Sequence, residues 1–186
     1  MADVISDASG ARDASGARDA SGAEGGDTPT GDIAHFRAVL GHFPTGIAVI
    51  TGILDGVPAG LTCQSFVSLS LDPLLVAFCP AKTSTSWARI DQSGAFCANV
   101  LAEGQEDISR VFATSGGDKF RGLGWRASDT GSPILNDVLA WVDCRIEARH
   151  DAGDHHIIVG RVVDLAATAH GRPLVAYRGG YGRFDA

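Results

Sequence analysis

Hydrophobic residues along the chain change their spacing once, near residue 44, and this change predicts a helix followed by strands. Before it, apolar side chains recur every three or four positions from Ile33 to Phe43, which is typical of one face of a helix. Asp32 is placed to cap this helix, which reaches about Gly41 and is ended by Pro44. The chain that follows carries the patterns of strands.

Short apolar runs separated by turn residues dominate the rest of the chain. The Asp55-Gly56 pair between two such runs predicts a β-hairpin. From 138 to 149, apolar and polar residues alternate, which predicts a strand with one buried face and one solvated face that carries Asp143. Further strands are predicted at 74–79, 96–101, 155–165 and 173–178, and short helices at 86–92 and 105–113.

These elements predict a mainly β fold. About six closely spaced strands are joined mostly by hairpins, and two or three short helices lie between them. Strands connected in this way favour a small closed barrel over a sheet of alternating strands and helices.

Residues 1–31 differ from everything after them. The segment 7–12 reads DASGAR, 13–18 repeats it, and 19–24 nearly repeats it again. Small and charged residues of this kind bury too little apolar surface to offset the entropy of ordering. We therefore expect a disordered low-complexity tail at 1–31, acting as a spacer or as a docking tail, and one domain at 32–186. The tail lacks the basic and apolar regions of a signal peptide.

Charge and cysteine content narrow the class of protein. The net charge of −7 and the lack of a basic stripe disfavour nucleic acid as a partner. No apolar run is long enough to span a bilayer. The four cysteines, Cys63, Cys79, Cys97 and Cys144, are widely spaced inside apolar runs, which indicates buried reduced thiols rather than zinc ligands or disulfides. The sequence thus predicts a cytoplasmic protein without a metal site.

The residue types favour an anion site over a catalytic dyad. Neither a G-x-G-x-x-G loop after a strand nor a G-x-x-x-x-G-K-[ST] loop occurs. Lys82 is followed by four hydroxyl residues that end at Ser86, at the start of a predicted helix. A cation beside helix amides suits phosphate, although the same residues could form an ordinary helix cap.

A series of motifs carries a family resemblance. FRAVLGHFPTGIAVIT, GLTCQSFVSLSLDPLLVAFCPAKTSTSW, SGAFCANVL, DKF and GDHHIIVGRV occur in this order between about residues 33 and 184. The series resembles the flavin reductase-like, FMN-binding split-barrel family, the NAD(P)H:flavin oxidoreductase components of two-component monooxygenases. Among its subgroups it is most similar to actinobacterial reductases that serve steroid-ring or phenol hydroxylases.

The resemblance implies a fold and an activity. The fold would be a six-stranded Greek-key split barrel, present as a homodimer with flavin at the interface. The activity would be hydride transfer from NADH, with NADPH as the alternative, to FMN or FAD, followed by release of the reduced flavin to a partner monooxygenase. A flavin-binding electron carrier on the same barrel is the alternative. An oxidase of the pyridoxamine-phosphate type is disfavoured, because few Arg and Lys residues surround the candidate site.

The resemblance also implies site residues. His155 would face the flavin and help to position the nicotinamide or its phosphate, while His156 would point to the other face of its strand. Phe120 would cover the ring or the adenine-side opening. The remaining cofactor contacts implied are Pro44, Thr45 and Gly46; Thr62, Cys63, Gln64, Ser65 and Phe66 along the ring edge; Lys82, Ser84 and Ser86 at the phosphate; and Tyr177 and Arg178.

Overall fold

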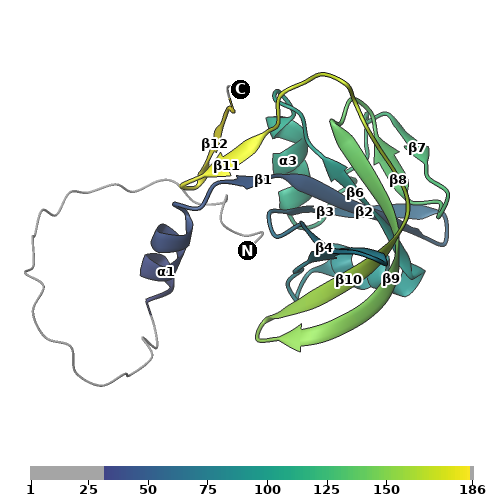
Figure 1. Ribbon diagram of the computed structural model, residues 1–186, viewed down its shortest axis with the longest axis horizontal. Coiled ribbons are helices and arrows are strands. Elements are labelled where there is room, and N and C mark those ends of the chain that lie inside the picture. Colours follow the sequence, from purple (N-terminus) through teal and green to yellow (C-terminus); the bar gives the residue numbers. More distant parts are fainter. Residues whose placement is uncertain (1–31, 185–186) are drawn as a thin grey trace, which may run out of the picture.

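A large antiparallel sheet forms the centre of the protein (Figure 1). The computed structural model describes residues 32–184, so the predicted tail at 1–31 lies outside the described residues. The sheet has seven strands in the order β3-β2-β6-β9-β10-β5-β4. Their bounds are β2 (Ala48–Leu54), β3 (Val57–Cys63), β4 (Val67–Leu71), β5 (Leu74–Phe78), β6 (Ala95–Val100), β9 (Ala140–Ala152) and β10 (His155–Ala167).

The two edge strands of this sheet, β3 and β4, follow each other directly in the sequence. Only Gln64, Ser65 and Phe66 lie between them, and we call these residues the edge link. The four residue steps from Cys63 to Val67 span at most about 14 Å of extended chain. The sheet must therefore curl until the linked ends of its two edge strands lie close together, and Figure 1 shows that the sheet is strongly curved.

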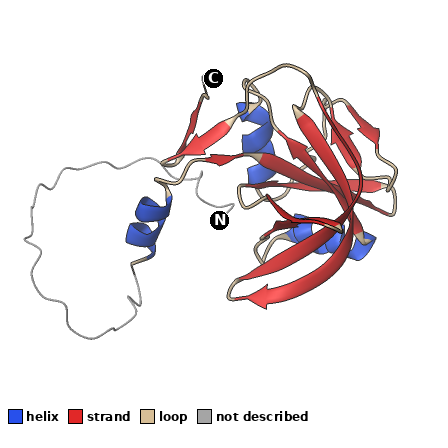
Figure 2. Cartoon of the chain, in the orientation of Figure 1, coloured by secondary structure: helices blue, strands red, loops and turns tan. Residues whose placement is uncertain are grey.

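Three helices and two small sheets surround the large sheet (Figure 2). The helices are α1 (Ile33–Leu40), α2 (Thr85–Ser93) and α3 (Glu106–Ala113). One small sheet joins β1 (Thr45–Gly46), β11 (Val175–Tyr177) and β12 (Gly180–Gly182), and the other joins β7 (Trp125–Ala127) and β8 (Pro133–Leu135). The predicted mainly β class with two or three helices is confirmed. The described residues form twelve strands instead of about six, since strands of two or three residues leave no periodic signal.

Three local predictions are confirmed, and the structure shows the physical cause of each. The Asp32 carboxylate accepts a hydrogen bond of 2.9 Å from the His35 backbone N–H and so caps α1. Asp55 and Gly56 both have positive φ, as the tight turn between β2 and β3 requires. Gly94 ends α2 in the left-handed conformation that a glycine adopts without strain.

The core consists of two hydrophobic clusters. The first lies inside the curled sheet, where Phe78 contacts both Phe96 and Trp87 edge-on, with ring centroids 4.9 and 5.5 Å apart. The second surrounds Phe112 and Phe120, between α3 and the segment that leads to β8. Together they bury many of the apolar positions in the predicted strands, although Leu74, Val163 and Leu165 remain exposed.

Asp143 contradicts its predicted place on a solvated face. It is fully buried. Its carboxylate accepts hydrogen bonds from the Thr130 backbone N–H (2.9 Å) and hydroxyl (2.6 Å). The loop before β8 covers this face of β9, a long-range contact that alternation within one strand does not encode. Because buried polar groups need partners, Asp143 fixes that loop in place.

We predict that Gly60→Ala destabilises the fold by about 1–3 kcal/mol, the usual range for forcing extra volume into a packed core. A Cβ at Gly60 would lie 2.7 Å from Cδ1 of Phe112, so α3 would have to move away from β3. Urea unfolding measures the difference. Gly182→Ala is the matched control, because a Cβ there meets nothing within 4 Å. Equal stability of the two variants would contradict this packing.

Candidate functional site

A cavity of about 590 Å³ lies between the curled sheet and the lobe formed by α1, β1, β11 and β12. We call it the main cavity. It brings together six of the residues implied by the resemblance, from both ends of the chain. These six are Thr45, Gln64, Ser65, His155, Tyr177 and Arg178. Phe36 and Leu40 of α1, Cys79 after β5, and Arg37 also line it and were not foreseen.

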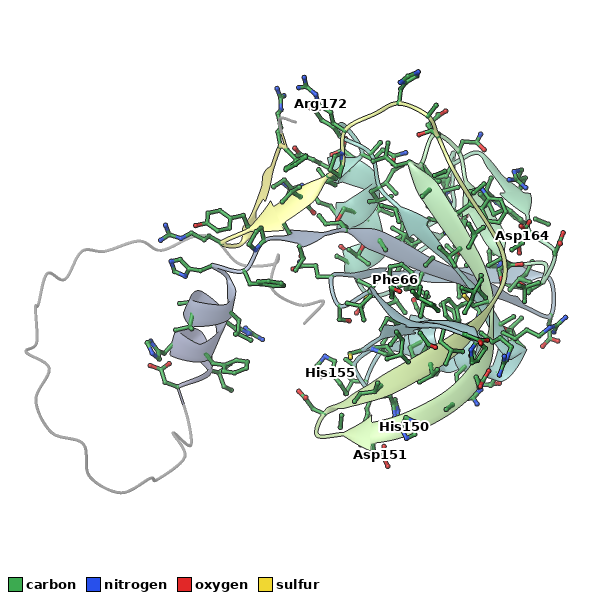
Figure 3. All side chains as sticks on the ribbon, in the orientation of Figure 1. Phe66, His150, Asp151, His155, Asp164 and Arg172 are labelled. Atoms are coloured by element: carbon green, nitrogen blue, oxygen red, sulfur yellow. The ribbon has the colours of Figure 1, made fainter. Side chains whose placement is uncertain are left out.

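The edge link forms one wall of the main cavity. Ser65 Oγ accepts a hydrogen bond of 2.8 Å from the Cys79 backbone N–H, which ties the link to the end of β5. The Thr45 hydroxyl donates to Gln64 Oε1 at 3.4 Å, which ties it to β1. Phe66 packs against the first core cluster instead of lining the cavity (Figure 3). The link is thus held from three sides.

Thr62 and Cys63 direct their side chains away from the main cavity. The buried Thr62 hydroxyl donates to the Ser109 backbone carbonyl at 2.6 Å. Cys63 is 3% exposed, and burial raises the pKa of its thiol. Cys97 and Cys144 are likewise buried free thiols, as predicted, whereas Cys79 is half-buried. Contacts from Thr62 and Cys63 to a ligand in the cavity would therefore come from the backbone.

Pro44 and Gly46 flank Thr45 without lining the main cavity, and both are exposed. Tyr177 and Arg178 contribute its far wall. The Arg178 backbone N–H donates to the Gly41 carbonyl at 2.9 Å, and this bond holds Arg178 at a positive φ of 49°. A left-handed conformation in a residue other than glycine costs energy, so the turn here is fixed by its surroundings.

His155 lies at the tip of the β9–β10 hairpin, where it lines the main cavity (Figure 3). Its Nδ1 is 2.8 Å from Asp154 Oδ1, and this contact lowers the pKa of the Asp154 carboxyl. His156 does not line the cavity; its Nδ1 lies 3.4 Å from Asp151. Of the two histidines, His155 is therefore the one that lines the main cavity.

Lys82 is not grouped with Ser84 and Ser86 as the resemblance implied. Its ammonium lies 2.9 Å from Asp151 on the hairpin, and the Lys82 backbone N–H donates to the Asp154 carbonyl. The hydrogen bond and the charge of Lys82 lower the pKa of the Asp151 carboxyl. Lys82 therefore joins the segment before α2 to the hairpin that carries His155.

The cation beside Ser86 is Lys119. Its ammonium donates to Ser86 Oγ at 3.3 Å and to the backbone carbonyls of Gly60 and Phe112 at 3.1 and 3.2 Å. Burial lowers the pKa of Lys119. Lys119 belongs to the DKF motif, but the family resemblance implied a role only for the phenylalanine of this motif, Phe120. Phe120 itself is 9% exposed and packs edge-on against Phe112 in the second core cluster.

The main cavity suits a flat ligand with negative charge. Apolar side chains from α1 offer one face, the edge link offers polar groups, and Arg37 and Arg178 supply positive charge. Residues 32–184 hold no group of three or more His, Cys, Asp or Glu side chains placed to bind a metal. Within the same range, no helix has both the length and the apolar character needed to cross a membrane.

A curled antiparallel sheet with such a cavity beside its edge link defines the class as a mainly β protein with a site for a small ligand. Residues 40–185 match the family model described as flavin reductase like domain. The chain belongs to this family, which confirms the resemblance, and it is therefore an oxidoreductase that acts on flavin.

Individual relatives agree with the family. Over 150 residues the chain is 53% identical to the reductase subunit HsaB of a flavin-dependent monooxygenase from Rhodococcus jostii, covering 81% of this chain and 77% of that one. It is 43% identical to the FMN reductase (NADH) SmoA of Agrobacterium fabrum, covering 81% and 85%. The crystal structure of nitrilotriacetate monooxygenase component B from Mycobacterium thermoresistibile has a TM-score of 0.80 at 47% identity, covering 82% and 86%.

We predict that Lys82→Met raises the pKa of the Asp151 carboxyl toward its ordinary value. The reason is that Lys82 supplies the hydrogen bond and the charge that lower it. An NMR titration of side-chain carboxyl carbons measures the change, and Lys82→Arg, which keeps the charge, is the control. An unchanged Asp151 titration would show that Lys82 does not engage the hairpin.

Proposed function

We propose that this protein transfers a hydride from NADH to FMN or FAD and releases the reduced flavin to a partner monooxygenase. The observation that carries the proposal is the main cavity, where His155 and the edge link line the same space. The relatives' names support it, since one is a reductase subunit of a monooxygenase and another an FMN reductase that uses NADH. The alternative, a flavin-binding electron carrier, requires the same cavity without turnover.

The residues present fit a flavin. The cavity volume of about 590 Å³ lies within the range of roughly 300–1,000 Å³ that is usual for small-molecule sites. Phe36 and Leu40 provide apolar surface for a ring system, and Gln64 and Ser65 provide polar groups for its edge. Nicotinamide and flavin themselves supply the hydride chemistry, so the protein needs to bind and orient them.

His155 is held where it could orient the nicotinamide nucleotide. The bridge between His155 and Ala81 and the hydrogen bond of 3.0 Å from the His156 N–H to the Pro80 carbonyl fasten the hairpin to the segment before α2. The Asp154 carboxylate, with Oδ1 2.8 Å from His155 Nδ1, helps to orient the ring. We assign His155 to binding the negatively charged part of NADH.

A homodimer would cover apolar surface that one chain leaves in water. None of the residues of α1 is buried, and Figure 1 shows the helix standing away from the large sheet. The exposed apolar side chains on α1 and just after it are Ile33, Phe36, Val39, Leu40 and Phe43, and those on β4 and β5 are Val67, Leu69, Leu71 and Leu74. Exposed apolar side chains gathered on one element are typical of association sites.

The proposed assembly is a split-barrel dimer in which the second chain packs on these two surfaces. Because α1 also lines the main cavity, a partner that covers α1 would help to enclose the flavin there. Excluding water would strengthen the interaction of the cavity's charges with the ligand.

We predict that His155→Ala raises the KM for NADH about tenfold, while the dissociation constant of flavin changes less than about twofold. A hydrogen bond to a charged group contributes about 1.5–3 kcal/mol, which corresponds to tenfold or more. Steady-state oxidation of NADH with added FMN or FAD gives KM, and fluorescence titration gives flavin affinity. His156→Ala is the control. Tight flavin retention by the unaltered protein without NADH oxidation would favour the electron carrier instead.

We predict that Leu69→Glu converts the dimer to a monomer. Leu69 is 52% exposed on β4, so a charge is tolerated in a single chain but would be buried unpaired in the assembly. Light scattering after size exclusion measures the mass. Val111→Glu on α3 is the matched control, because Val111 is similarly exposed at 44% but lies outside the two apolar surfaces. A wild-type monomer, or an unchanged dimer in Leu69→Glu, would contradict the proposed interface.

A further inference from the structure

The edge link brings two cysteines from different strands to one serine. Cys63 ends β3, and Cys79 follows β5 directly. The Cys63 sulfur lies 3.2 Å from Ser65 Oγ, and the Cys79 backbone N–H donates to the same oxygen at 2.8 Å. The two residues are far apart in the sequence, but they are neighbours at the place where the linked edges of the sheet meet.

The Cys63 sulfur also interacts with the Cys79 backbone directly. Burial raises the pKa of the Cys63 thiol, while hydrogen bonds from Ser65 and from the Cys79 backbone N–H act in the opposite direction. The sulfur of a cysteine is only a few bonds from its own backbone nitrogen. A sulfur that reaches the N–H of Cys79 is therefore close to the Cys79 thiol, as the geometry of a disulfide requires.

The other two cysteines form no such pair. In the pairing of β6 with β9, Cys97 lies opposite Asp143 and Cys144 lies opposite Phe96. Residues directly opposite each other share a face of the sheet, and successive residues alternate between faces. Cys97 and Cys144 therefore point to opposite faces, and both are fully buried. They provide a comparison within the same chain.

The two thiols at the edge link differ in access. Cys79 is half-buried and lines the main cavity together with Ser65 and His155. Cys63 is 3% exposed and packs in the first core cluster. An oxidant in the main cavity would therefore meet Cys79 first, with Cys63 behind it.

The product of the proposed activity can generate such an oxidant. Reduced flavin that no monooxygenase takes up reacts with dioxygen. The flavin returns to its oxidised form, and the dioxygen receives two electrons and two protons and becomes hydrogen peroxide. This peroxide is formed where the reduced flavin is formed or released, beside Cys79.

We propose that Cys79 and Cys63 are a modification site for hydrogen peroxide, at which a disulfide forms and weakens flavin binding when reduced flavin is not taken up. The source of the peroxide rests on the proposed function, because it is the reduced flavin. The site itself is a property of the edge link.

The chemistry proceeds in two steps. The Cys79 sulfur attacks one peroxide oxygen, the O–O bond breaks, and the departing hydroxide takes the thiol proton and leaves as water, so that a sulfenic acid remains. The Cys63 sulfur then attacks the sulfenic sulfur, the S–O bond breaks, and the hydroxyl group leaves as water with the proton of Cys63. The two sulfurs together lose two electrons, and these reduce one peroxide to two waters.

A disulfide at this position would change the wall of the main cavity. The Ser65 hydroxyl now lies between the Cys63 sulfur and the Cys79 N–H, at 3.2 and 2.8 Å. Drawing the two cysteines together displaces this hydroxyl and breaks the bond that ties the edge link to the end of β5. Because Gln64 and Ser65 offer the polar groups of the wall, flavin affinity should fall.

Peptide mass measurement on the unaltered protein tests the pair without NADH or flavin. The sequence holds no Lys or Arg between Arg37 and Lys82, so trypsin leaves Cys63 and Cys79 together in peptide 38–82, which contains no other cysteine. After treatment of the reduced protein with hydrogen peroxide, this peptide should lose the mass of two hydrogen atoms, and a thiol reductant should reverse the loss. The peptides that contain Cys97 and Cys144 should keep their mass.

Flavin fluorescence titration before and after peroxide measures the consequence. The dissociation constant of flavin should rise about tenfold or more, as for loss of a buried hydrogen bond, and a thiol reductant should restore it. Each variant is compared with its own untreated state. Cys79→Ser and Cys63→Ala should both abolish the reversible change, whereas Cys144→Ala, the matched control, should keep it. If Cys63→Ala fails to fold, Cys79→Ser and the peptide mass still decide.

Turnover tests the source of the oxidant. With NADH and flavin in air the disulfide should accumulate in peptide 38–82, and in the same mixture without oxygen it should not. Disulfide formation without oxygen, or none in air, would overturn reduced flavin as the source of the peroxide.

Three results would overturn the modification site itself. These are no change in the mass of peptide 38–82 under peroxide, a gain of oxygen atoms in place of the loss of hydrogen, and a disulfide that leaves flavin affinity unchanged. They are distinct from a failure of the proposed function, in which the fully reduced protein would oxidise no NADH with any flavin, whatever peroxide did to the two cysteines.

Discussion

The short edge link between β3 and β4 is the constraint on which the rest of the structure depends. Two strands at opposite edges of a seven-stranded sheet are joined by only Gln64, Ser65 and Phe66, so the sheet has to curl on itself. The curl encloses the first core cluster and leaves the link itself at the meeting of the two edges. Polar groups on the link stay near solvent there, and the main cavity forms against them.

Helix α3 connects the two walls of that cavity. Its buried Ser109 accepts a hydrogen bond from the Thr62 hydroxyl through its carbonyl (2.6 Å) and one from Tyr181 through its own hydroxyl (3.0 Å). Thr62 precedes the edge link, and Tyr181 belongs to the small sheet that carries Arg178. Buried hydrogen bonds of this kind are costly to break, so the walls are fixed relative to each other.

The positively charged side chains around the site differ in whether a carboxylate lies beside them. On the hairpin side Lys82 is paired with Asp151, and Asp154 contacts His155. On the side of α2 and α3 the charge of Lys119 meets only neutral oxygens. A paired charge stabilises the protein's own conformation, whereas an unpaired one is available to a ligand.

The sequence by itself determined the local structure. The Asp32 cap, the Asp55-Gly56 turn, the ends of α2 and the alternation from Cys144 to Arg149 in β9 follow from interactions between residues close in the chain, and the motif order predicted the family. Only the tertiary structure determined which side chains that are separated in the sequence come into contact. Asp143 is buried because a distant loop covers it, Lys82 turns to the hairpin, and Lys119 takes the place beside Ser86. The physical reason is that spacing along the chain determines which face of a helix or strand a residue occupies. Which other segment packs against that face depends on how the sheet curls.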